Sequence, residues 1–145
     1  MSDEIIKNPT AENSSLPKIL LIEDDAINAN VIQRFLKKDY EVDVAFRGIT
    51  GIELAIASSY CLILLDINLG RGMNGIDVLT EIKKSDMNVN TPVIASTAYT
   101  MKGDKEKLLQ AGFNDYISKP YTMDEILIKI KHHINEENKK NSSPV

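Results

Sequence analysis

The chain has few of the residues that build disulfide frameworks or aromatic surfaces. Its 145 residues include one cysteine, no tryptophan and 6% aromatic residues. Because a single cysteine cannot form a disulfide within the chain, we expect a reducing compartment. Cys61 lies at the start of an apolar run, which predicts a small buried residue rather than a reactive thiol.

Long hydrophobic runs and clusters of positive charge are also missing. No segment approaches the roughly 20 apolar residues of a membrane-spanning helix, so no membrane partner is expected. The acidic start Met1-Ser2-Asp3-Glu4 lacks the basic region and apolar core of a signal peptide, which predicts a cytoplasmic location. The net charge is -4 and the lysines are scattered, so no nucleic-acid partner is expected.

What remains is the composition of a single globular domain, 43% hydrophobic and 26% charged. Residues 1–17 and 136–145 are polar and without periodicity, so both segments are predicted to be flexible. Between them, over residues 18–135, five short apolar runs alternate with helical patterns. The predicted strands cover about 18–23, 41–46, 61–66, 92–96 and 114–118.

Each predicted strand is followed by a predicted helix with apolar residues at helical spacing. In the first helix we expect Ile27, Val31 and Phe35 on the core-facing stripe, with Ile32 and Leu36 beside it. The other stripes are Ile49, Ile52 and Ile56; Ile76, Leu79 and Ile82; and Ile126, Ile130 and Ile134. The fourth helix is expected from Thr100 to about Ala111, with Gly112 ending it, and Thr122 with Glu125 forms a capping box.

Five alternating strand–helix units predict a three-layer α/β domain with a parallel five-stranded sheet. For this length, right-handed crossovers favour the flavodoxin-like (βα)5 strand order 2-1-3-4-5. The strand over 61–66 is fully apolar and therefore central, whereas the strand over 41–46 alternates with Asp43 and is expected at a more exposed edge.

Polar residues follow or end four of these strands. They are Glu23, Asp24 and Asp25 after the first, Asp66 at the end of the third, Ser96 and Thr97 after the fourth, and Lys119 after the fifth. Ligands of an open parallel sheet bind outside the carboxyl ends of its strands, so these side chains should converge. The strand order places the first acids beside Asp66.

Three converging carboxylates would repel one another unless a cation neutralised them. Glu23, Asp24 and Asp66 offer only oxygen ligands, which favours Mg²⁺ (or Mn²⁺) over softer metals. Lys119 adds an ammonium and Thr97 a hydroxyl donor, a set suited to phosphoryl transfer. Asp66 ends the central strand and is the predicted acceptor of an aspartyl-phosphate.

Residues 18 to about 135 resemble the receiver domain of two-component response regulators, the CheY-like fold. The motifs that carry the resemblance are Leu21-Ile22-Glu23-Asp24-Asp25, Leu64-Leu65-Asp66-Ile67-Asn68, Ser96-Thr97-Ala98 and Tyr116-Ile117-Ser118-Lys119-Pro120, with Met73-Asn74-Gly75 and Ala111-Gly112 in support. The loop 69–73 departs from the family pattern, since it lacks the usual proline and is one residue longer.

The resemblance implies a phosphorelay module rather than an enzyme with an external substrate. Asp66 would accept a phosphoryl group from the phosphohistidine of a sensor histidine kinase or a histidine phosphotransfer protein. Asp24, Asp66 and the backbone carbonyl of Asn68 would bind Mg²⁺, with Glu23 acting through water. Lys119 and Thr97 would hold the phosphoryl group, and the chain would assist its own phosphorylation and dephosphorylation. The Lys119-Pro120 bond would be cis.

The resemblance also implies a switch. Thr97 would move toward the phosphoryl group and Tyr116 would turn inward, which remodels the face formed by the fourth helix, fifth strand and fifth helix, roughly Met101 to Ile134. The segment after residue 135 is too short to fold into an output domain. If the chain is complete, we expect a monomer or weak dimer that signals through contacts with a downstream protein, which the sequence does not identify; the sequence does not distinguish this from a part of a hybrid kinase or larger regulator.

Two other classes share parts of the pattern. A phosphatase of the haloacid dehalogenase type also uses an aspartate, a hydroxyl residue, a lysine and Mg²⁺, but its nucleophile follows the first strand and further acids follow its lysine. A flavodoxin-like cofactor binder needs a phosphate-binding loop after the first strand, where this chain has three acids and no glycine.

Overall fold

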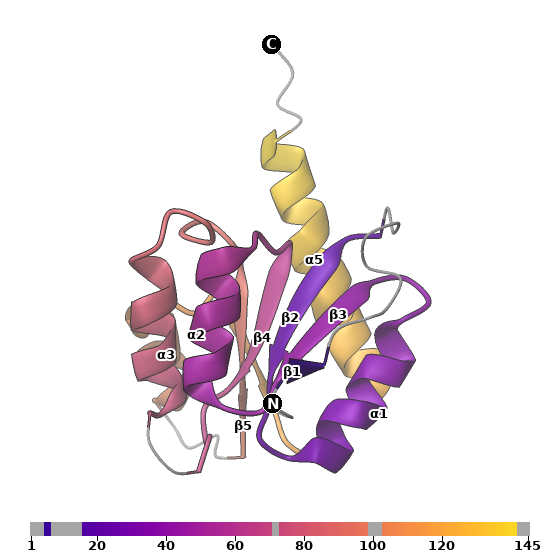
Figure 1. Ribbon diagram of the computed structural model, residues 1–145, viewed down its shortest axis with the longest axis horizontal. Coiled ribbons are helices and arrows are strands. Elements are labelled where there is room, and N and C mark those ends of the chain that lie inside the picture. Colours follow the sequence, from indigo (N-terminus) through magenta and orange to yellow (C-terminus); the bar gives the residue numbers. More distant parts are fainter. Residues whose placement is uncertain (1–4, 7–15, 71–72, 99–102, 142–145) are drawn as a thin grey trace.

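A six-stranded sheet forms the centre of the protein (Figure 1). The computed structural model describes residues 5–6, 16–70, 73–98 and 103–141, with side chains described over 16–70, 73–98 and 103–135. The elements are β1 Ile5–Ile6, β2 Lys18–Ile22, α1 Ala26–Leu36, β3 Glu41–Ala45, α2 Gly48–Ala57, β4 Leu62–Asp66, α3 Gly75–Lys83, β5 Val93–Thr97, α4 Asp104–Ala111, β6 Asp115–Ser118 and α5 Met123–Asn141.

The strand order is β1-β3-β2-β4-β5-β6. The five strands from β2 to β6 are parallel, and β1 pairs antiparallel with β3. Counted among the parallel strands alone, this is the order 2-1-3-4-5, so the predicted flavodoxin-like topology is confirmed. The two-residue strand β1 was not predicted, and most of the segment 1–17 lies outside the described residues.

Alternate strand residues face two separate apolar cores. Helices α2 and α3 lie on one side of the sheet, and α1 and α5 lie on the other (Figure 1). Leu20 and Ile22 of β2 face the core that also contains α2, α3 and α4 residues. Ile19 and Leu21 face the core that contains α1 and α5 residues. Both faces of β2 and β4 are therefore covered, which explains why these two strands are apolar along most of their length.

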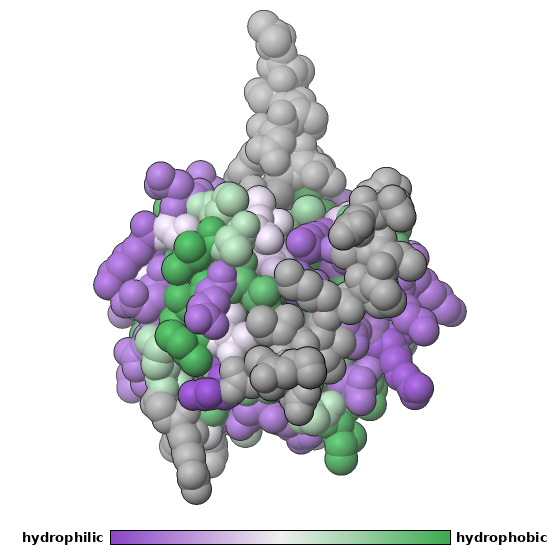
Figure 2. Space-filling view, in the orientation of Figure 1, coloured by the Kyte–Doolittle hydropathy of each residue, from purple (hydrophilic) through white to green (hydrophobic). Residues whose placement is uncertain are grey.

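The predicted core-facing stripe of α1 is wrong, although Ile32 and Leu36, expected beside it, are buried. Ile27, Val31 and Phe35 are exposed, and the side chains that α1 buries are Ala29, Ile32 and Leu36. Both rows have helical spacing, so periodicity alone does not say which row faces the sheet. The predicted core-facing residues of α2 and α3 are also wrong in part, because Ile49, Ile56 and Ile76 are exposed. Apolar atoms are visible over α2 in Figure 2.

The strand β3 is not the exposed edge that its alternating pattern predicts. All five of its residues are buried, and β1 pairs with Val44 and Ala45 on its outer side. Asp43 accepts a hydrogen bond from the Tyr60 hydroxyl at 2.8 Å and lies 3.7 Å from the Lys18 ammonium. A charged residue in a buried strand is tolerated here because it has these polar partners.

The predicted residues that end α4 and begin α5 are confirmed. Gly112 ends α4 with a φ of 115°, a left-handed conformation that suits glycine, and Thr122 and Glu125 form the reciprocal bonds of a capping box. The described part of α4 begins at Asp104, and 100–102 lie outside the described residues.

The structure differs from the sequence-based expectations at the start of β4 and at the end of α5. The prediction that Cys61 is buried in a strand is wrong, since Cys61 is exposed and lies just before β4. Helix α5 continues to Asn141, beyond the expected domain boundary at 135 (Figure 1). Among the described residues, no helix is both long and apolar enough to cross a bilayer.

Candidate functional site

The predicted polar residues converge at the carboxyl edge of the sheet. Register pairs Ile22 of β2 with Leu65 of β4, and Asp66 of β4 with Ser96 of β5. This alignment brings the acids after β2 beside the end of β4. Carboxylate oxygens of Glu23, Asp24 and Asp66 lie within 4.8 Å of one another. Glu23 and Asp66 are buried, whereas Asp24 is exposed at the rim.

Lys119 reaches this cluster from the segment after β6. Its Nζ atom lies 2.9 Å from Asp66 Oδ2 and 3.5 Å from Glu23 Oε1. The Lys119 amide donates to the Thr97 carbonyl at 2.8 Å, which continues the strand pairing to the site. The Lys119-Pro120 peptide bond is cis, as the resemblance implies. Burial lowers the pKa of Lys119, but the hydrogen bond to Asp66 and the charges of Glu23 and Asp66 outweigh it and raise that pKa above its usual value.

One ammonium faces three carboxylates, so the cluster keeps an excess of negative charge. Burial, followed by the negative charge of Asp66, raises the pKa of Glu23 from 4.5 to about 7, although Lys119 and the Asp25 amide act against the rise. A divalent cation with oxygen ligands would relieve this repulsion. The donor set therefore fits Mg²⁺, and two of its three carboxylates are held by the ends of β2 and β4.

The loop after β4 is fixed close to Asp66. The Asn68 amide donates to Asp66 Oδ1 at 2.9 Å, and the Ile67 amide donates to the Ser96 carbonyl at 2.9 Å. Gly75 at the start of α3 is packed so closely that a Cβ there would lie 2.7 Å from Ile67 Cα and 2.9 Å from the Asp66 carbonyl oxygen. Residues 71 and 72 of the unusual loop lie outside the described residues.

Thr97 ends β5 and is 5% exposed. With Ile67, Asn68 and Leu108 it lines a cavity of about 210 Å³ between the loop after β4 and helix α4. Tyr116 belongs to β6 and is half-buried against the core on the α2–α4 side. Register pairs Thr97 with Ser118, so Tyr116 lies one pleat back from the strand end.

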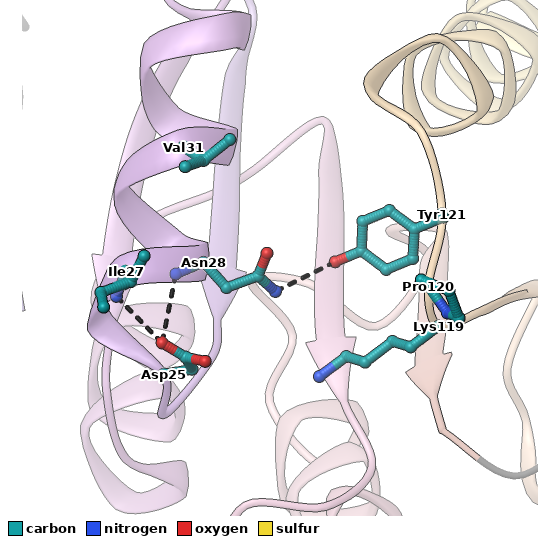
Figure 3. A pocket seen from close by; sticks show the side chains of 7 residues that line it. All are labelled: Asp25, Ile27, Asn28, Val31, Lys119, Pro120 and Tyr121. Carbon is teal, nitrogen blue, oxygen red and sulfur yellow. Dashed lines mark hydrogen bonds between the residues drawn. The ribbon is translucent and has the colours of Figure 1, made fainter.

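A second pocket, of about 390 Å³, opens beside Lys119 (Figure 3). Residues of α1 and residues 119–121 line it. Asn28 of α1 donates from Nδ2 to Glu23 Oε1 at 2.9 Å and to the Tyr121 hydroxyl at 3.3 Å. The position of Asn28 in the sequence fits a solvated residue as well as one at the rim of the site, and nothing in the sequence indicates Tyr121. No local pattern indicates a contact between residues 93 positions apart.

Comparisons with known proteins agree with this geometry. The family model described as "Response regulator receiver domain" matches residues 19–131. Response regulator ArlR of Staphylococcus saprophyticus is 35% identical over 87% of this chain and 56% of its own length. Hybrid signal transduction histidine kinase B of Dictyostelium discoideum is 34% identical over 92% of this chain and 8% of its own length.

A solved structure gives the same result. The receiver domain of sensor histidine kinase PA1611 from Pseudomonas aeruginosa PAO1, with a magnesium ion coordinated in its active site cleft, is 34% identical with a TM-score of 0.76. The match covers 83% of this chain and 99% of that domain. The chain spans about half the length of the first curated relatives it matches. Together with the strand order and the acidic edge, these matches show that the chain belongs to the response regulator receiver domain family of two-component signalling.

Proposed function

We propose that Asp66 is the phosphoacceptor of this receiver domain. The observation that carries the proposal is the Asp66 carboxylate itself, which is 2% exposed at the end of β4, 2.9 Å from the Lys119 ammonium and within 4.8 Å of the Glu23 and Asp24 carboxylates. An Asp66 oxygen attacks the phosphorus of a phosphohistidine, and a P–O bond forms as the P–N bond breaks. The imidazole nitrogen keeps the electron pair of the broken bond.

Glu23, Asp24, Asp66 and the Asn68 backbone carbonyl are the residues that would hold Mg²⁺ or Mn²⁺. The oxygen-only donor set and the raised pKa of Glu23 support this assignment, as does the magnesium ion in the PA1611 receiver domain. When bound, the cation neutralises the carboxylates and the phosphoryl oxygens. The Asn68 amide keeps one Asp66 oxygen in place through its hydrogen bond.

Lys119 and Thr97 complete the proposed site on the other side of Asp66. The Lys119 ammonium is already bound to Asp66 Oδ2 and would stabilise a phosphoryl oxygen as a positive point charge. Thr97 ends the neighbouring strand and borders the cavity beside Asn68, so its hydroxyl can donate to a second phosphoryl oxygen. Both groups act by position and charge, which is the main contribution of protein side chains to phosphoryl transfer.

Phosphorylation would be transmitted through Thr97 and Tyr116 to the face of α4, β6 and α5. Movement of Thr97 toward the phosphoryl group would open space on the side where Tyr116 is half-buried. Receiver domains are signalling modules that interact with histidine kinases and downstream proteins. For this chain we propose a phosphohistidine donor, from a sensor kinase or a phosphotransfer protein, and a protein as the downstream partner.

Incubation of the whole chain with acetyl phosphate and Mg²⁺, followed by intact-mass and peptide mass spectrometry, tests the proposal. We expect an adduct of about 80 Da on Asp66. Asp66→Asn should abolish the adduct, and Asp24→Asn should weaken metal binding and slow labelling. Asp86→Asn removes an exposed carboxylate outside the cluster and serves as the matched control. Full labelling of the Asp66→Asn protein at the same rate would refute the assignment.

A further inference from the structure

Asn28 links the acidic cluster to the segment that carries Lys119. It lies in the first turn of α1, which begins after the Asp25 N-cap. Its Nδ2 atom donates one hydrogen to Glu23 Oε1, at 2.9 Å, and one to the Tyr121 hydroxyl, at 3.3 Å. Figure 3 shows the amide directed across the pocket toward Tyr121, next to the Lys119 side chain. An amide nitrogen has two hydrogens, so both bonds can form at once.

The hydrogen bond from Asn28 to Glu23 affects which of two carboxylates, Glu23 or Asp66, the Lys119 ammonium contacts most closely. The Lys119 ammonium lies 3.5 Å from Glu23 Oε1 and 2.9 Å from Asp66 Oδ2. Glu23 Oε1 accepts from Asn28, and Glu23 Oε2 accepts from the Asp25 amide at 3.2 Å. With a neutral donor on each oxygen, the Glu23 carboxylate is held in one orientation and the ammonium remains closest to Asp66. Without Asn28, Oε1 would be free to draw the ammonium away.

The Glu23 carboxylate, which can only accept, selects the NH2 end of the Asn28 amide, and Tyr121 holds the amide in place through a second hydrogen bond. The hydroxyl accepts one Nδ2 hydrogen, and the second hydrogen is directed at Glu23 Oε1. A flipped amide would place its oxygen against a carboxylate, where it has no hydrogen to offer. Tyr121 is itself half-buried against the core on the α1–α5 side, so its hydroxyl is a fixed reference point.

We propose that Asn28 is a positioning residue, held in place by Tyr121, that fixes the Glu23 carboxylate for the divalent cation and keeps Lys119 on Asp66. This inference rests on the proposed function, because it assigns the residue to the same cation site. It predicts that a residue outside the carboxylate set controls metal affinity, as groups that hydrogen-bond to metal-binding side chains commonly do.

Isothermal titration of Mn²⁺ and Mg²⁺ into the whole chain measures the effect directly. Asn28→Ala should weaken the affinity roughly tenfold, within the range of other losses of such supporting bonds. Tyr121→Phe removes only the hydroxyl and should weaken it by a smaller factor, about threefold. Asn30→Ala is the matched control, since Asn30 is the other asparagine of α1 and is exposed, and it should change the affinity by less than about twofold.

Two further measurements distinguish the positioning role of Asn28 from a role in fold stability alone. The metal-free thermal midpoint of Asn28→Ala should match that of Asn30→Ala. In the double variant Asn28→Ala with Tyr121→Phe, the affinity should be no weaker than in Asn28→Ala alone, because the hydroxyl acts through the amide. Multiplied losses in the double variant, or an unchanged affinity in Asn28→Ala, would overturn the inference. If Asn28→Ala does not fold, Tyr121→Phe keeps the side-chain shape, and wild-type affinity in it would overturn the inference.

The wild-type protein separates this inference from the proposed function. If wild type neither binds the cation nor gains the acetyl phosphate adduct, the proposed function fails and the positioning role fails with it. If wild type binds and is labelled on Asp66 while Asn28→Ala binds the cation equally well, the positioning role alone is refuted.

Discussion

The Lys119 ammonium lies 2.9 Å from Asp66 Oδ2, although the two residues are 53 positions apart in the chain. Lys119 is the only cation that an ion pair joins to Glu23 or Asp66 in the part of the chain with described side chains. Glu23 and Asp66 are almost fully buried, whereas Lys119 is partly exposed. The pair therefore both stabilises a buried charge cluster and places a positive charge where a phosphoryl oxygen would form.

Lys119→Met should destabilise the metal-free protein at neutral pH, because it leaves two buried carboxylates without their cation. We expect a loss of about 1–3 kcal/mol in the free energy of unfolding, less than for a fully buried pair because Lys119 is partly exposed. Urea denaturation in EDTA and in excess Mg²⁺ measures it. The loss should shrink with Mg²⁺, which neutralises the same carboxylates, and an equal loss in both conditions would argue against a shared site. Lys84→Met, at an exposed pair with Glu81, is the control.

Glu23→Gln should stabilise the metal-free protein at pH 8 but not at pH 5. Burial and the charge of Asp66 raise the pKa of Glu23 from 4.5 to about 7, so the folded state binds this proton more tightly than the unfolded chain does. The stability that the group contributes is present below pH 4.5 and is lost as the pH rises through about 7. Glutamine removes the charge, and we expect a gain of about 1–3 kcal/mol at pH 8 in EDTA. Urea denaturation at both pH values checks it, and an equal gain at both would contradict the charge argument.

Thr97→Ala should permit phosphorylation but weaken its transmission. The hydroxyl at the end of β5 is the group we expect to move toward the phosphoryl group, with Tyr116 responding. Amide hydrogen exchange with and without beryllofluoride, a phosphoryl mimic, should show changed protection over residues 103–134 in wild type and smaller changes in the variant. The same changes in both proteins would rule out coupling through Thr97.

Gly75→Ala should both destabilise the protein and slow labelling of Asp66. The new Cβ would lie 2.7 Å from Ile67 Cα and 2.9 Å from the Asp66 carbonyl oxygen, so backbone next to the acceptor must shift. We expect a cost of about 1–3 kcal/mol, typical of overpacking. Gly48→Ala is the control, because its shortest contact, 2.7 Å, is with a Val78 methyl group. Chemical denaturation measures the stability of both variants, and the rate of adduct formation measures labelling of Asp66. Normal labelling in Gly75→Ala would show that the close packing of Gly75 against Ile67 and Asp66 is not needed for phosphorylation.

Truncation of two isoleucines of α1 should lower the stability by very different amounts. Ile32 is fully buried in the core on the α1–α5 side, whereas Ile27 is 78% exposed. Ile32→Ala should cost about 2–5 kcal/mol and Ile27→Ala less than about 0.5 kcal/mol. Thermal or urea unfolding of the two variants compares the rows directly. A larger loss for Ile27→Ala would mean that α1 packs with its other row against the sheet, and equal losses would contradict the burial of Ile32 alone.

Much of the site could be predicted from residue order alone. Glu23, Asp66, Thr97 and Lys119 each lie at or just after the end of a short apolar strand, and parallel strands bring their carboxyl ends to one edge. Right-handedness, a local property of twisted strands and crossovers, then leaves few strand orders, of which the flavodoxin-like order is the commonest for this length. For the same reason Gly112 and the Thr122–Glu125 capping box were predicted correctly, since backbone geometry at a helix end depends on neighbours within a few residues.

Other features were decided only by packing between distant segments. Periodicity placed apolar rows on α1, but the position of the helix against the sheet selected Ala29, Ile32 and Leu36 over Ile27, Val31 and Phe35. The alternation in β3 predicted exposure, yet β1 covers its outer side and Tyr60 provides a partner for Asp43. These outcomes depend on which surfaces meet, and local spacing carries no information about that.

The sequence by itself determined which chemical groups reach the edge of the sheet. Each strand is a short apolar run that local residues define, and the acids lie at or directly after the ends of these runs. Only the tertiary structure decided how those groups are held. It brought Asn28 of α1 to the Glu23 carboxylate and Tyr121, 93 residues further along, to the Asn28 amide, and it buried Glu23 beside Asp66 so that the pKa of Glu23 rises. Hydrogen bonds and charge interactions act through space, so they depend on the packing of α1 and of residues 119–121 around the sheet.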